Sequence, residues 1–256
     1  KPPLEPMTRA SFARAVEAKG GKVTKSPKSG SKKSWPTPLV VVPAVFDEWD
    51  TPVSTSGSPK ETKTSTSAVP DWAAPGEQSA YSVSELYQRR DEDAPGFVPN
   101  RAYETGVFLK FVVDHYDDLP EYVMFVHGHE YAYHAPTSMA TTCRLDVPAA
   151  VEAMGGFASL NHDKRGRTVR KYADRLMPSP WSPAFLARAL AELYGTAEQP
   201  PVSTPTKLAF PASAQFAASR SAIRKRPRAF YARAYNLSTA ATPETCRGRT
   251  CGGFAE

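Results

Sequence analysis

The chain has 256 residues, of which 41% are hydrophobic, so it is long enough to bury a sizeable core. Its formal net charge is +6, but residues 1–35 hold nine Lys or Arg against two Glu, so the rest sums to about −1. The basic residues therefore gather in the N-terminal segment, which argues against a core that binds nucleic acid. No window approaches the ~18 apolar residues of a membrane helix, and no transmembrane span is expected.

Two segments are poor in large apolar side chains. Residues 1–35 combine a short predicted helix, 8–19, with a Lys/Ser/Gly/Pro-rich stretch, and residues 51–79 are rich in Ser, Thr and Pro. We interpret them as a basic tail or linker and as an insertion in a single domain that spans residues 36–256. Because few apolar groups offset the entropy of ordering them, both segments are predicted to pack on other protein subunits. The expected anchors are their large apolar residues, Phe12, Trp35, Trp49, Val53, Val69 and Trp72.

Apolar runs and helical periodicity alternate along the rest of the chain. The runs predict strands near 39–43, 122–127, 157–160 and 208–217. Amphipathic spacing predicts helices over 104–117, from Asp146–Pro148 onward, over 183–194, and over 221–235 with an interruption at Pro227. This alternation predicts an α/β fold, with a mixed or mainly parallel sheet flanked by helices.

Three segments carry a resemblance to a known family. They are LVVVPAVFDEW (39–49), VPNRAYETGVFLKFVVDHYDDLPEYVMFVHGHEYAYH (98–134) and SAQFAASRSAIRKRPRAFY (213–231). In order and spacing they resemble the eukaryotic family catalogued as domain of unknown function 3431, over roughly residues 36–256. The layout of that family is similar to the GT-A glycosyltransferases, which implies a GT-A-like fold and a sugar nucleotide as ligand.

The sequence departs from the family pattern at two places. Ala102-Tyr103 stand between Asn100-Arg101 and Glu104, where the family has Gly-Arg before the Glu, and Ser213 replaces a usual Cys. The resemblance therefore leaves the activity of this member open. The chain begins at Lys1, so a removed targeting peptide would place it in the secretory pathway or Golgi, or in an organelle.

A histidine cluster follows the predicted strand 122–127. If strand geometry continues, His127 and His129 share a face, and His134 or Glu130 from the next loop can complete a site. Imidazole with carboxylate suits a divalent metal such as Mn or Zn. A polar ligand pocket without metal and a purely structural set of hydrogen-bonded histidines remain open as alternatives.

Other candidates gather at predicted element ends. Asn100 and Glu104 flank a helix start, where an anion is favoured, although both also suit simple capping. Gln215, Ser219 and Arg220 follow an extended run and are candidate ligand-binding residues, with capping by Ser219 as the alternative. Glu104 and Glu130 are the candidate catalytic carboxylates. The acidic run 91–93, which follows Arg89-Arg90, is interpreted as a solvated loop.

Two functions of different classes follow. The first is a glycosyltransferase-like enzyme whose His-rich pocket binds a sugar nucleotide or another polar ligand. The second is a non-catalytic structural or linker subunit of a larger assembly, anchored by residues 1–35 and 51–79.

Overall fold

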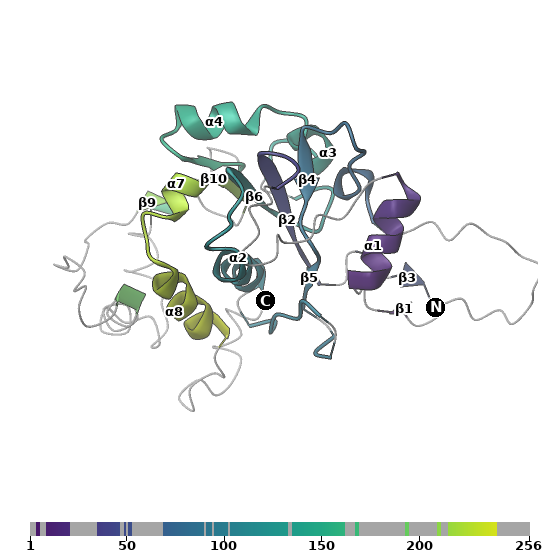
Figure 1. The fold of residues 1–256 in the computed structure, drawn as a ribbon, viewed down its shortest axis with the longest axis horizontal. Coiled ribbons are helices and arrows are strands. Elements are labelled where there is room, and N and C mark those ends of the chain that lie inside the picture. Colours follow the sequence, from purple (N-terminus) through teal and green to yellow (C-terminus); the bar gives the residue numbers. More distant parts are fainter. Residues whose placement is uncertain are drawn as a thin grey trace, which may run out of the picture.

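The computed structural model describes residues 4–5, 9–20, 35–46, 49, 51–52, 69–89, 91–93, 95–101, 103–132, 135–161, 167–168, 193–194, 209–210 and 215–239. Within them a six-stranded sheet forms the centre, in the order β4-β2-β6-β10-β7, with β5 also pairing with β2 (Figure 1). Its strands are β2 (Leu39–Val45), β4 (Tyr81–Val83), β5 (Tyr87–Gln88), β6 (Tyr122–His127), β7 (Phe157–Ser159) and β10 (Phe216–Ser219). Two further pairs are short: β1 (Leu4–Glu5) with β3 (Thr51–Pro52), and β8 (Arg167–Thr168) with β9 (Ala209–Phe210).

The sheet is mixed. Strand β2 runs parallel to β6 and to both β4 and β5, which follow one another along its other edge. Strand β10 is antiparallel to β6 and to β7. All seven residues of β2 are buried, which explains why a continuous apolar run forms it: helices cover both of its faces. The predicted α/β class with a mixed sheet is confirmed.

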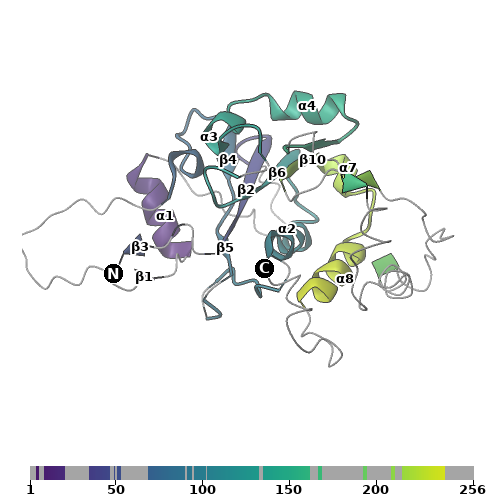
Figure 2. The same ribbon diagram turned by 180° about the vertical axis from the view of Figure 1, so that it is seen from behind.

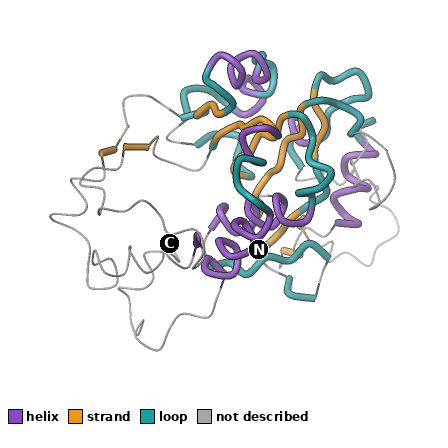
Figure 3. The backbone as a smooth tube through the Cα atoms, turned by 60° about the vertical axis from the view of Figure 1, so that its left-hand side comes forward, coloured by secondary structure: helices purple, strands orange, loops and turns teal. Residues whose placement is uncertain are grey.

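Helices cover the two faces of the sheet (Figures 1 and 2). Helix α2 (Tyr103–Asp114) packs on one face with α8 (Arg228–Thr239) beside it. The other face is covered by α1 (Arg9–Ala18), the 3-10 turn η1 (Asp71–Ala73), α3 (Met139–Thr142) and α4 (Val147–Ala153). Alternate residues of each strand therefore enter different clusters, Val40 and Phe125 with α2, Val41 and Met124 with α1. In Figure 3 the strands of the six-stranded sheet lie between these helices.

Most predicted elements appear close to their expected places. Asp146 caps α4 by accepting a hydrogen bond from the Ala149 backbone N–H at 3.0 Å, as expected. The predicted helix over 221–235 divides at Pro227 into α7 (Arg220–Ile223) and α8. The predicted strand 208–217 is wrong as one element, since β9 and β10 are separate strands in different sheets. Of the helix predicted over 183–194, only 193–194 lie among the described residues.

The prediction that residues 1–35 and 51–79 pack on partners rather than on their own domain is wrong for the anchor side chains that the structure describes. Phe12 in α1 is fully buried and its ring stacks on Trp49, with centroids 5.6 Å apart. Trp49 in turn meets Trp72 of η1 edge-on at 5.7 Å. Trp35 lies against Phe111 of α2. Val69 is also buried and belongs to the same cluster as Phe12 and Trp49. Val53 lies outside the described residues. These side chains belong to the core of their own domain, because apolar rings that are far apart along the sequence pack together in the fold.

The basic run after β10 binds the end of α2. Arg224 donates through Nη2 to the backbone oxygens of Tyr116 (3.1 Å) and Asp117 (2.8 Å), and Arg228 donates through Nε to that of Val113 (3.0 Å). Val113 lies in the last turn of α2, where carbonyls lack partners within the helix and carry partial negative charge, and Tyr116 and Asp117 lie in the turn that follows. The arginines therefore bind α2 to the segment that carries α7 and α8.

Replacing Arg224 with alanine is expected to lower the free energy of unfolding by about 1 kcal/mol, since two charge-assisted hydrogen bonds are lost at an exposed site. Its exposed neighbour Lys225, replaced with alanine, is the matched control and should change stability by less than about 0.5 kcal/mol. Urea denaturation of the two variants measures the difference. Equal losses would show that the carbonyl contacts contribute nothing measurable.

Candidate functional site

Polar side chains collect where β2, β5 and β6 end on one edge of the sheet. In parallel α/β sheets this carboxyl edge is where ligands usually bind. His127 is the last residue of β6 and faces the same side as Phe125, toward α2. The next residue is fixed on both sides, because the Gly128 N–H donates to the Ala44 oxygen (3.1 Å) and its oxygen accepts from Trp49 Nε1 (2.7 Å).

His127 is paired with the first carboxylate of α2. Its Nδ1 lies 2.9 Å from Glu104 Oε1, and the two side chains are 14% and 19% exposed. Burial alone raises the pKa of Glu104, but the hydrogen bond and charge of His127, with further help from Arg89, lower it below its ordinary value. Glu104 is therefore a carboxylate at neutral pH, and its bond fixes the orientation of the imidazole.

Arg89 is a member of this site that sequence reasoning missed. It is only 6% exposed, although arginine is almost never fully buried unless it is paired. Its Nη1 donates to Asn100 Oδ1 at 3.1 Å, and its guanidinium lies over the Phe46 ring at 5.5 Å. Its place directly after β5, at the same edge as His127, has no signal in the sequence, because a two-residue strand has no pattern of its own. In the sequence Arg89 stands instead beside the acidic run 91–93, which indicates a solvated loop.

Gln215 connects the strand ends from the other side. Its side chain is buried, and Oε1 accepts from the His127 backbone N–H at 3.3 Å. Its backbone oxygen accepts from the Leu160 N–H (3.0 Å) and from Asn161 Nδ2 (2.8 Å). The predicted candidates Glu104, Asn100, Gln215 and His127 thus come together around one strand end.

The chain also takes up an uncommon backbone conformation here. Tyr103, the first residue of α2, has a φ of 49°. A positive φ is rare for a bulky residue and persists only where surrounding structure enforces it. It lies between Asn100 and Glu104, where the sequence departs from the family pattern. The strained residue therefore sets the direction in which Glu104 enters the site.

The other histidine-cluster candidates lie elsewhere. Strand β6 ends at His127 and the chain bends over 128–130, so strand alternation does not extend to His129, which is exposed. The Glu130 carboxylate accepts from the Ala140 N–H at 3.2 Å, at the start of α3. His134 lies outside the described residues. Among the described residues, no three His, Cys, Asp or Glu side chains are arranged to hold a metal ion.

Ser219 and Arg220 lie at the opposite end of the sheet from His127. The register pairs Ser219 with Tyr122, the first residue of β6. Ser219 caps α7 by accepting from the Ala222 N–H (3.2 Å), as its alternative interpretation stated, and Arg220 donates through Nε to the Pro120 oxygen (3.3 Å). The structure therefore gives both residues local contacts and does not bring them to the His127–Glu104 pair.

Comparisons with known proteins concern the family alone. None of the helices in the described ranges is long and apolar enough to cross a membrane. Neither the curated proteins nor the solved structures yielded a match. A family model matches residues 62–252, which include Arg89, Asn100, Glu104, His127 and Gln215, and the chain therefore belongs to the family described as Protein of unknown function (DUF3431).

Proposed function

We propose that the chain is a glycosyltransferase-like enzyme that binds a polar ligand, a sugar nucleotide in the first instance, beside the His127–Glu104 pair. The observation that carries the proposal is this partly buried pair, 2.9 Å between Nδ1 and Oε1, at the carboxyl edge of parallel strands. The family resemblance implied a strand ending in polar residues, an Asn-and-Glu helix start and a Gln-Phe run. These three features correspond to His127, to Glu104 with Asn100, and to Gln215. They meet at one edge of the sheet.

The pair suits proton removal from an acceptor hydroxyl. When the imidazole is neutral and donates its Nδ1 proton to the Glu104 carboxylate, its lone pair lies on Nε2. In the proposed transfer the acceptor oxygen bonds to the anomeric carbon of the donor sugar while its proton passes to Nε2. The bond from that carbon to the leaving phosphate breaks, and the phosphate oxygen keeps the electron pair. A positioned base of this kind contributes typically about 10²–10⁴-fold in rate.

A divalent ion stays part of the proposal. Mn or Zn would be held by imidazole nitrogen and carboxylate oxygen, and in that case His127 and Glu104 would serve as ligands in place of the proton-accepting pair. When bound, the ion would neutralise charge on the diphosphate. The buried cation of Arg89 lies near the same carboxylate and supplies a fixed positive charge there.

The alternative is a non-catalytic structural or linker subunit anchored by residues 1–35 and 51–79, and the described anchor side chains do not favour it. Phe12, Trp35, Trp49 and Trp72, which were to contact partners, lie in the core of their own domain. We therefore put the catalytic proposal forward alone.

A binding screen with matched histidine variants tests the proposal. The intact chain is heated with UDP-glucose, UDP-galactose, UDP-N-acetylglucosamine and GDP-mannose, each with and without Mn²⁺. A ligand at 100 times its Kd adds about 2.7 kcal/mol to the unfolding free energy. The wild-type protein and the exposed-histidine control His129→Gln should gain it with at least one donor, and release of the nucleoside diphosphate should follow. The His127→Gln variant should release no nucleoside diphosphate. The proposal is contradicted if all three proteins turn over equally, or if the wild type binds no donor.

A further inference from the structure

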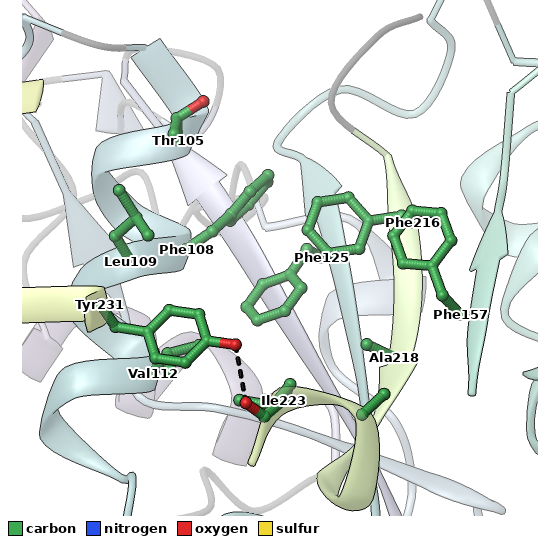
Figure 4. Close-up of a pocket in the computed structure, with 11 residues that line it drawn as sticks. Thr105, Phe108, Leu109, Val112, Phe125, Phe157, Phe216, Ala218, Ile223 and Tyr231 are labelled. Atoms are coloured by element: carbon green, nitrogen blue, oxygen red, sulfur yellow. Dashed lines mark hydrogen bonds between the residues drawn. The ribbon is translucent and has the colours of Figure 1, made fainter. Parts of the chain in front are cut away.

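A cavity of about 610 Å³ opens between α2, the sheet and the helices after β10 (Figure 4). The lining residues share an apolar character: Thr105, Phe108, Leu109, Val112, Phe125, Phe157, Phe216, Ala218, Ala222, Ile223 and Tyr231. The cavity is open to solvent on one side, and its volume lies within the 300–1,000 Å³ typical of ligand sites.

Aromatic rings form one wall of the cavity. Phe216 packs on Phe125 at 5.1 Å and stacks on Phe157 at 5.3 Å. Phe157 remains 41% exposed, which leaves a large apolar ring open to solvent at this wall. Figure 4 shows the Tyr231 hydroxyl directed inward, where it donates to the Ile223 backbone oxygen at 2.7 Å.

No lining residue carries a charge, so the cavity offers nothing that would hold a phosphate. The hydroxyl of Tyr231 is already used within the protein, and Thr105 is the other hydroxyl on the lining. Burying a sugar or phosphate here would leave its polar groups without partners, which is costly. The wall therefore suits a hydrocarbon group.

His127 and Glu104 do not themselves line the cavity, but one end of the cavity lies next to them in three elements. Thr105 follows Glu104 in α2, Phe216 follows Gln215 at the start of β10, and Phe125 faces the same side of β6 as His127. A ligand with its apolar part in the cavity thus has its polar end near the imidazole. We propose that the cavity holds the hydrocarbon part of an alcohol, the acceptor substrate, whose hydroxyl meets His127. This inference rests on the proposed function and names its acceptor class.

Two probe series of simple alcohols test it on the intact chain. One runs from 1-butanol to 1-octanol and the other from benzyl alcohol to 4-phenyl-1-butanol, which separates a chain from a ring as the occupant. A buried methylene contributes about 0.8 kcal/mol, so the Kd should fall about four-fold per added carbon in at least one series until the cavity is full. Amide signals of Thr105 and Ala218 should shift in NMR spectra on titration.

A variant that fills the cavity supplies the control. Ala222→Phe places a ring on the lining, while Ala153→Phe adds the same ring at an exposed position of α4. The first should abolish the dependence of Kd on chain length, and the second should retain it. An absence of chain-length dependence in the wild type, as expected if another part of the chain or a second copy fills the space, overturns the inference. So does a dependence that survives Ala222→Phe.

The alcohol titrations are made without a sugar donor, so they succeed or fail independently of the screen for sugar nucleotides. Alcohol binding without donor binding would support the hydrocarbon site and contradict only the proposed transfer.

Discussion

Replacing Phe12 with alanine is expected to lower the free energy of unfolding by about 3–5 kcal/mol, as truncation of a buried phenylalanine usually does. The ring is fully buried and stacks on Trp49, so alanine leaves a cavity between α1 and the sheet. Domains are stable by only about 5–15 kcal/mol, so the variant loses a large share of its stability. Chemical denaturation measures the change.

The matched control is Glu17→Ala, an exposed substitution in the same helix, which should be nearly neutral. Deleting residues 1–20 should destabilise the domain at least as much as Phe12→Ala. A deletion variant that unfolds at the wild-type denaturant concentration would show that α1 does not belong to the core and would restore the tail as a separate segment.

Arg89→Met is the second change with a large expected effect. Methionine retains much of the side-chain volume but removes the hydrogen bond to Asn100, the contact over Phe46 and the positive charge near Glu104. Loss of one member of a buried charged network costs about 3–5 kcal/mol. Arg101→Met, at an exposed position twelve residues on, is the control and should cost little.

The same variant changes the response to acid. In the folded wild type the pKa of Glu104 is lowered, so its stabilising contribution is present above the pKa of the unfolded chain, about 4.3, and is lost as pH falls through the lower folded value. Removing Arg89 raises the folded pKa, so the variant should lose this contribution at a higher pH. NMR titration of the Glu104 carboxyl measures the change directly, and an unchanged pKa would contradict the assigned role of Arg89.

The parts of the fold that were predictable are those with strong local signals. Strands β2 and β6 are continuous apolar runs, and α2 and α4 have clear periodicity, with an Asp146 cap on α4. Strands β4 and β5 have three and two residues. They exist because β2 offers them hydrogen-bonding partners, which no pattern within such short segments can indicate.

The site was predictable to the extent that it lies at ends of strong elements. His127, Glu104 and Gln215 were identified because they border β6, α2 and β10. Arg89 was missed because its burial depends on residues that pack over it from distant parts of the chain. His129 was misplaced because β6 ends at His127, two residues before the position that alternation would have to reach.

The central strand lies outside the region that defines the family. The family match begins at residue 62, whereas β2, which pairs with β4, β5 and β6, spans Leu39–Val45. A protein expressed from residue 62 onward would lack β2, and the backbone groups of β4 and β6 that pair with it would have no hydrogen-bonding partners. Such edges recruit strands from other molecules, so this fragment should aggregate or capture β2 supplied in trans. Family boundaries drawn by similarity thus cut through the folding unit, and domain libraries of these proteins should begin ahead of α1.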